Sequence, residues 1–121
     1  MLAVVDYEMG NLRNVAKAFE HLGRSVEVTG DPERLMVAEG IVLPGVGAFG
    51  DCMANLRQRG LVEPLCFLIA SGRPYLGICL GLQVLFDESD EFSTTRGMGV
   101  LRGCVRRFRQ GLKVPHMGWN Q

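Results

Sequence analysis

The sequence predicts an α/β fold built on a mostly parallel sheet with helices on both faces. Short apolar runs typical of buried strands alternate along the chain with segments whose apolar residues recur at helical spacing. Strands that are connected through helices lie parallel, with right-handed crossovers. Ligands of such sheets bind beyond the carboxyl ends of the strands, so functional residues are expected at that edge.

Four segments have the length and apolar pattern of strands. Three are apolar runs, and one alternates polar and apolar residues. A further segment near the C-terminus, residues 99–108, alternates like an antiparallel strand or a hairpin arm. The four main strands are predicted at residues 2–5, 25–29, 41–44 and 74–78.

Helices are predicted in the intervals between these strands. The first covers residues 12–22, with Asn11 as its N-cap and Gly23 at its end. A short helical turn opens at residues 31–34. Residues 53–69 hold either one helix broken near Gly60 or two short helices. A last helix is expected over residues 80–86.

The composition predicts a single globular domain over residues 1–121. Of the 121 residues, 47% are hydrophobic and 21% are charged, which is ordinary for one domain. Thirteen acidic and thirteen basic side chains cancel, so neither nucleic acid nor an anionic membrane is expected as a partner. No apolar run reaches the roughly 18 residues of a membrane span, and the N-terminal run turns acidic at Asp6, which favours the cytoplasm.

The cysteines predict neither a metal site nor a disulfide framework. They form no close pair of the kind that binds zinc, and a mostly apolar chain does not depend on disulfides. We therefore expect reduced thiols, no metal and no cofactor. The four thiols are those of Cys52, Cys66, Cys79 and Cys104.

One of these thiols, Cys79, has the sequence context of a nucleophile. In GICLG it stands between Gly77 and Gly81, where an apolar strand meets a helix, like the serine of a nucleophile elbow. Side chains at the two glycines would collide with the neighbouring backbone. A helix N-terminus favours a thiolate, and the N–H of Leu80 could face an oxyanion. The alternative is a small buried packing residue, the role that we expect for the other three cysteines.

A second glycine cluster, residues 45–50, follows the third strand. GVGAFG matches the dinucleotide-binding pattern G-x-G-x-x-G, but that pattern normally lies in the first βα unit with an acidic residue about 20 positions further on. The alternative is a flexible backbone strip, residues 44–47, whose N–H groups complete an oxyanion hole beside Cys79.

These segments resemble a known family. GICLGLQ, residues 77–83, is similar to the cysteine elbow of the class I, triad-type glutamine amidotransferases. DYEMGN (6–11), LPGVGAFGDCM (43–53) and KVPHMGWN (113–120) look like segments of the glutaminase subunit of imidazole glycerol phosphate synthase, in histidine biosynthesis. The resemblance runs from the first strand to the last residue. It implies a flavodoxin-like three-layer fold, incomplete at the C-terminus.

The resemblance also implies roles for individual residues. Cys79 would attack the side-chain amide of glutamine to form a thioester, and the ammonia would pass to the (β/α)₈ cyclase subunit of the same synthase. The remaining roles are an oxyanion hole at Val46, Gly47 and Leu80, glutamine binding at Gly45 and Gln83, and a partner interface at Asn11, Asn14 and Trp119.

The chain departs from the family pattern in two places. Glu8 stands where the family's DYxxGN motif commonly has glycine. The His-Pro-Glu motif that supplies the base and its carboxylate does not occur before Gln121, and neither His21 nor His116 is expected to replace it. The chain by itself is therefore predicted to be a truncated domain and a poor glutaminase. Its exposed sheet edge would favour self-association.

Three functions remain open on these grounds. The first is the glutaminase subunit. The second is a non-catalytic amidotransferase-like module that binds the cyclase subunit. The third is a cysteine hydrolase of similar fold with another substrate.

Overall fold

The computed structural model of the chain describes residues 1–8, 11–90 and 95–106. Strands and helices alternate along the first 83 residues, and three short strands follow. The elements are β1 (Leu2–Val5), α1 (Leu12–His21), β2 (Val26–Thr29), α2 (Pro32–Val37), β3 (Gly40–Gly45), α3 (Phe49–Gln58), α4 (Val62–Ala70), β4 (Tyr75–Cys79), α5 (Leu80–Gln83), β5 (Phe86–Ser89), β6 (Thr95–Arg96) and β7 (Leu101–Val105).

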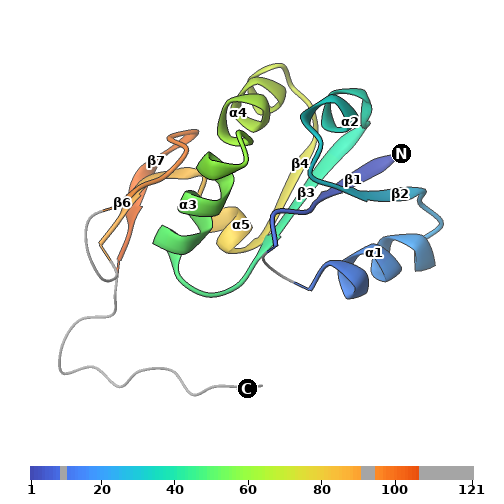
Figure 1. The fold of residues 1–121 in the computed structure, drawn as a ribbon, viewed down its shortest axis with the longest axis horizontal. Helices are drawn as coiled ribbons and strands as arrows, with labels where there is room; N and C mark the ends of the chain where they lie inside the picture. Colours follow the sequence, from blue (N-terminus) through green and yellow to red (C-terminus); the bar gives the residue numbers. More distant parts are fainter. Residues whose placement is uncertain (9–10, 91–94, 107–121) are drawn as a thin grey trace.

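The main sheet has the strand order β2-β1-β3-β4, and all its pairs are parallel. The chain steps in one direction from β1 to β2 and in the other from β2 to β3 and β4. Right-handed crossovers then place α1 on one face and α2, α3 and α4 on the other. Figure 1 shows this separation, with α1 apart from the other three helices. The predicted parallel sheet with helices on both faces is confirmed.

The core lies between the sheet and the three helices that cover one of its faces, α2, α3 and α4. Every second residue of the central strands points into it, because side chains alternate across a strand. Leucines of the covering helices pack on these residues, and each buried leucine contributes about 1.5–3 kcal/mol relative to an exposed one. The sheet contributes Ala3, Val5, Ile41 and Leu43, and the helices contribute Leu35, Met53, Leu56, Leu65 and Leu68.

The opposite face of the sheet is covered less completely. No residue of α1 is fully buried. Val28 on β2 and Leu76 on β4, which alternate with core-facing positions, remain 42% and 47% exposed. Self-association through such apolar surface stays a prediction. Within the described ranges, no helix is both long and apolar enough to cross a lipid bilayer.

A small second sheet, in the order β6-β5-β7, was not predicted. The helix expected to run through Phe86 ends at Gln83, because long-range hydrogen bonds take the carbonyls that a longer helix would need. Val84 O accepts from the N–H of Met98 at 2.7 Å, and Leu85 O accepts from that of Leu101 at 2.8 Å. The strand expected within residues 99–108 forms, but it pairs parallel with β5, so the antiparallel expectation is wrong for that pair.

Local signals set the ends of α1 and the break between α3 and α4 as predicted, whereas α3 begins at Phe49, four residues before the predicted start at residue 53. Asn11 caps α1, because its Oδ1 accepts a hydrogen bond from the N–H of Asn14 at 3.3 Å. Gly23 follows that helix with a φ of +83°, and Gly60 separates α3 from α4 with a φ of +66°. Both are left-handed conformations that glycine adopts without steric cost. Of the two alternatives for residues 53–69, two helices are therefore observed.

Glu8 occupies a left-handed backbone conformation as well, with a φ of +68°. Its N–H donates to Asp6 Oδ1 at 3.2 Å, and its carboxylate forms an exposed ion pair with Arg59 at 2.9 Å. A residue with a Cβ pays roughly 1–2 kcal/mol for this conformation. The glycine that the DYxxGN motif commonly has at this position therefore has a steric explanation.

This geometry predicts that Glu8→Gly is more stable than Glu8→Ala by about 1 kcal/mol. Both variants lose the ion pair with Arg59, so the difference between them reports the backbone alone. Urea unfolding of the two variants measures it. An alanine variant as stable as the glycine variant would contradict the strain at this residue.

Candidate functional site

The most unusual backbone in the sheet is at Cys79, where β4 turns into α5. Its φ of 56° and ψ of −116° form a sharp strand-to-helix turn, and its side chain is exposed. Such a conformation costs a non-glycine residue on the order of 1–3 kcal/mol and occurs preferentially at functional sites. A cysteine that only fills space requires neither the strain nor the exposure. The predicted strand-turn-helix context is confirmed.

The two glycines around Cys79 are required by close backbone packing. A Cβ at Gly77 would strike the carbonyl of Gly81 within the turn, and a Cβ at Gly81 would overlap the carbonyl of Leu43 on β3. The elbow therefore lies directly against the central strand. This confirms the collisions expected from the sequence.

The turn is also held by the hydroxyl of Tyr75 at the start of β4. This hydroxyl donates to the carbonyl of Gly81 at 2.6 Å, across the elbow. Burial raises the pKa of Tyr75 well above its usual value, so the group stays a protonated donor. Tyr75 thus fixes the first turn of α5 against its own strand.

The register of the sheet brings the second glycine cluster to the same place. Gly45, the last residue of β3, is the partner of Cys79 across the parallel pair. Residues 46 and 47 continue from that point, with Val46 59% exposed and Gly47 at a φ of +99°. An exposed thiol and a glycine-containing backbone strip thus lie together at the carboxyl edge of the sheet.

The family model for class I glutamine amidotransferases matches residues 3–121. The chain belongs to this family. Two curated relatives, each called imidazole glycerol phosphate synthase subunit HisH, come from Geobacter metallireducens and Syntrophotalea carbinolica. They are 54% and 55% identical over 99% and 100% of this chain and over 60% and 62% of their own lengths. The chain thus spans about three fifths of these relatives.

Solved structures agree with the fold. A crystal structure titled as a glutamine amidotransferase superposes with a TM-score of 0.74 at 23% identity, covering 93% of this chain and 59% of that one. A structure titled as a putative peptidase E protein from Listeria monocytogenes gives 0.68 at 16% identity, covering 83% and 62%. At such low identity these matches support the fold alone.

Membership of the amidotransferase family favours the oxyanion-strip interpretation of residues 45–50 over the dinucleotide one. In a dinucleotide fingerprint the last glycine allows close packing of helix on strand. Gly50 lies inside α3, and a Cβ there would make only ordinary contacts with Thr95, at 3.5 Å or more. That glycine is therefore not required by packing.

The remaining amidotransferase roles suggested by the sequence stay predictions. Leu80 begins α5 and is almost fully buried, while Gln83 ends it and is half-buried. Asn11 and Asn14 are both exposed at the start of α1. Because α1 follows the carboxyl end of β1, these two residues lie at the same edge of the sheet as Cys79. Trp119 and His116 lie outside the described residues.

His21 is not brought to Cys79. It is the last residue of α1, and this helix runs back towards the amino ends of the strands. The site is at the opposite edge. Within residues 1–8, 11–90 and 95–106, no group of three or more His, Cys, Asp or Glu residues could hold a metal ion.

The other thiols differ from Cys79 in exposure. Cys52 is fully buried, and Cys66 and Cys104 are partly buried. Burial raises the pKa of the Cys52 and Cys66 thiols above their usual value, which keeps them protonated. Cys79 is therefore the most accessible thiol of the four.

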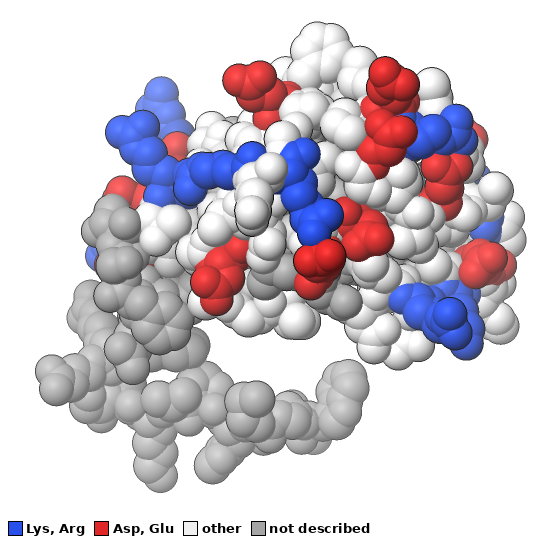
Figure 2. Space-filling view, viewed as in Figure 1, with Lys and Arg blue, Asp and Glu red and all other residues white. Residues whose placement is uncertain are grey.

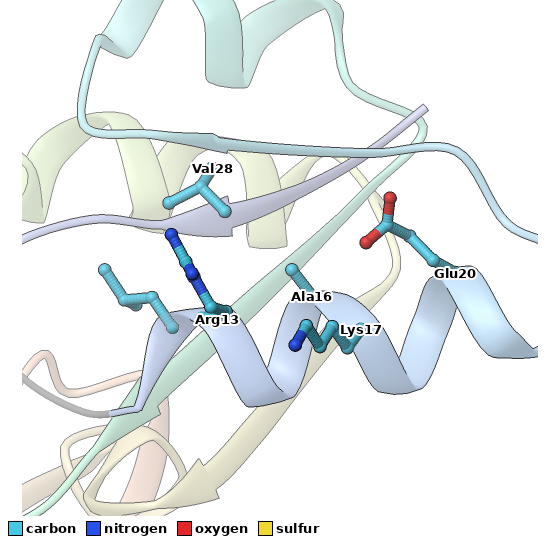
Figure 3. Close-up of a pocket in the computed structure, with 6 residues that line it drawn as sticks. Arg13, Ala16, Lys17, Glu20 and Val28 are labelled. Carbon is cyan, nitrogen blue, oxygen red and sulfur yellow. The ribbon is translucent and has the colours of Figure 1, made fainter.

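A surface hollow of about 490 Å³ lies between α1 and the edge strand β2 (Figure 3). Val28 and Ala16 face each other across it, with Arg13, Lys17 and Glu20 at its margin. It lies away from the elbow, and none of the four cysteines lines it. Figure 2 shows acidic and basic side chains interspersed over the visible face, as the zero net charge leads one to expect.

Sequence reasoning missed the two tyrosines of the site, Tyr7 and Tyr75. The chain has only these two, and each hydroxyl donates to a backbone carbonyl near the elbow or the strip. Tyr7 lies in the DYEMGN segment and Tyr75 just before the elbow, but nothing in the sequence assigns either hydroxyl a role. Only the three-dimensional pairing of β1, β3 and β4 identifies them.

Proposed function

We propose that the chain is the glutaminase part of imidazole glycerol phosphate synthase and acts on glutamine through Cys79. The observation that carries the proposal is the exposed thiol on a strained elbow, in register with the glycine strip at the end of β3. The relatives named as subunits of that synthase, identical at more than half of the aligned positions, support it.

The reaction begins at the sulfur of Cys79. The thiolate attacks the side-chain amide carbon of glutamine, and the carbonyl oxygen becomes an oxyanion. The N–H groups of Leu80 and of the strip at Val46 and Gly47 stabilise that charge. The C–N bond then breaks, the nitrogen takes up a proton and leaves as ammonia, and water hydrolyses the thioester to glutamate. Gly45 and Gln83 contribute to binding glutamine.

The proton transfers need a base, which is normally a histidine oriented by a carboxylate. His21 stands at the other edge of the sheet, so we assign the base to a group outside the described residues. The exposed elbow leaves room for that group, because the Cys79 side chain is not covered by the residues that the structure describes.

The partner in this proposal is the cyclase subunit, which uses the ammonia. Asn11 and Asn14 lie at the same sheet edge as the thiol and are exposed, which suits a docking face close to the point of ammonia release. Trp119 belongs to the same proposed interface. Direct transfer to the partner would protect ammonia from loss to solvent.

The test is glutamine hydrolysis by the natural gene product, mixed with the cyclase subunit of the same organism. We expect equal amounts of glutamate and ammonia from glutamine, none from asparagine, and a rate that depends on the cyclase subunit. Binding to the cyclase subunit without glutamate formation would favour the non-catalytic module. Hydrolysis of an unrelated amide or ester, independent of the cyclase subunit, would favour the other hydrolase.

A further inference from the structure

Tyr7 is a fully buried tyrosine in the loop that follows β1. Its hydroxyl donates to the carbonyl of Pro44 at 2.6 Å and lies 3.2 Å from the sulfur of Cys52 on α3. Pro44 is the first residue of the strip that leads to Val46 and Gly47. The loop after β1, the end of β3 and the start of α3 therefore meet at one hydroxyl.

The direction of these hydrogen bonds follows from the number of protons. A tyrosine hydroxyl has one proton, and the Pro44 carbonyl can only accept, so the Cys52 thiol is the donor to the Tyr7 oxygen. Burial, followed by the contact with Cys52, raises the pKa of Tyr7 well above its usual value. Both groups thus stay protonated, and the order is Cys52 S–H to Tyr7 O–H to Pro44 carbonyl.

The position of Pro44 explains why this contact matters. The ladder between β1 and β3 ends at the pair of Val4 and Val42, two residues before Pro44. The Tyr7 hydroxyl therefore supplies a hydrogen bond to β3 beyond its last pair with β1, while on the other side the pairing with β4 continues through Gly45 and Cys79. Because the peptide bond is planar, fixing the Pro44 carbonyl also fixes the direction of the Gly45 N–H.

The glycine at position 45 fits the same arrangement. A Cβ there would collide with the Tyr7 hydroxyl and lie 3.0 Å from the Cβ of Leu80. The hydroxyl thus occupies the space that a side chain at Gly45 would need. From this fixed point onward the strip is free to turn, as the positive φ of Gly47 shows.

We propose that Tyr7 is the positioning residue of the oxyanion strip, because its hydroxyl anchors the Pro44–Gly45 peptide next to Cys79. This inference rests on the proposed function, since it assigns a chemical purpose to the strip. It predicts that the hydroxyl matters only for reactions in which Cys79 creates an oxyanion.

Two reagents that alkylate Cys79, one through an oxyanion and one without, test this prediction on the natural gene product. A chloroketone analogue of glutamine passes through an alkoxide when the thiolate adds to its ketone, before chloride leaves. Iodoacetamide loses iodide by direct displacement and needs no oxyanion hole. Tyr7→Phe is expected to slow labelling of Cys79 by the chloroketone roughly 10-fold and to leave labelling by iodoacetamide unchanged.

Ser71→Ala is the matched control. It removes another hydroxyl-to-carbonyl hydrogen bond, to Leu68 at 2.7 Å, at the end of α4 and on the opposite edge of the sheet. Both labelling rates should remain at the wild-type value. If Tyr7→Phe does not fold, Cys52→Val removes the donor to Tyr7 and should slow the chloroketone about 3-fold, while Cys52→Ser restores a donor and the rate.

The outcomes separate this inference from the proposed function. If the wild-type protein shows no preference for the glutamine chloroketone over a chloroketone without the glutamine side chain, the proposed function fails. If it shows that preference and Tyr7→Phe keeps the full rate, the role of Tyr7 is overturned. Equal slowing of both reagents in Tyr7→Phe would also overturn it, because the loss would then be a general structural one.

Discussion

Cys79→Ala is expected to abolish glutamine hydrolysis, lowering its rate roughly 10⁴-fold or more, and to leave the free energy of unfolding nearly unchanged. The thiol is exposed, so its removal opens no cavity, but the proposed reaction has no second nucleophile. Cys79→Gly should be equally inactive and more stable than Cys79→Ala by about 1 kcal/mol, because glycine tolerates a φ of 56° with a ψ of −116°.

Hydrolysis measured on the natural gene product with the proposed partner, the cyclase subunit, and urea unfolding of the same variants give the two readouts. Cys66→Ala is the control, since this partly buried thiol lies outside the elbow and its loss should leave hydrolysis intact. A glycine variant no more stable than the alanine variant would mean that the elbow stores no strain. Hydrolysis that persists in Cys79→Ala would require another nucleophile.

The parallel sheet could be predicted because its signals are local. A strand buried on both faces must be apolar at every position, as in Ile41, Val42 and Leu43, and a helix must show its apolar residues at helical spacing. The elbow was predictable for a similar reason. Its two glycines are required by contacts between neighbouring backbone segments, and they are adjacent to Cys79 in the sequence.

The length of α5 was not predictable from local sequence. Val84, Leu85 and Phe86 suit a helix as well as a strand. The strand is selected by hydrogen-bond partners from distant segments, Met98 for Val84 and Leu101 for Leu85. The β5–β7 pairing follows from the same long-range contacts. Apolar periodicity alone therefore overextended the helix.

The candidate site shows the same division between local and long-range information. The glycines at residues 45 and 47 are visible in the sequence, but the position of Gly45 opposite Cys79 depends on the register of β3 against β4. Tyr7 enters the site only because the loop after β1 folds over the end of β3, onto α3. Such contacts between distant segments leave no pattern in a single sequence.

Gly81→Ala is expected to destabilise the protein by about 3 kcal/mol or more, the largest effect on stability among the changes considered. Gly81 lies within α5, where helix propensity alone would favour alanine by up to about 1 kcal/mol. The clash reverses that sign, because the added Cβ would overlap the backbone carbonyl of Leu43. A backbone group of the central strand cannot turn away as a flexible side chain can, so either the elbow or the strand must shift.

Gly50→Ala provides the matched control, since Gly50 also lies in a helix and a Cβ there meets Thr95 only at an ordinary 3.5 Å. The free energy of unfolding of Gly50→Ala should be unchanged or higher by up to about 1 kcal/mol. Thermal and urea unfolding of both variants measure the difference, and the rate of Cys79 alkylation reports whether the elbow keeps its shape. A Gly81→Ala protein as stable as Gly50→Ala would show that the elbow does not pack against Leu43. In that case packing against Leu43 would not explain why the elbow has a glycine at position 81.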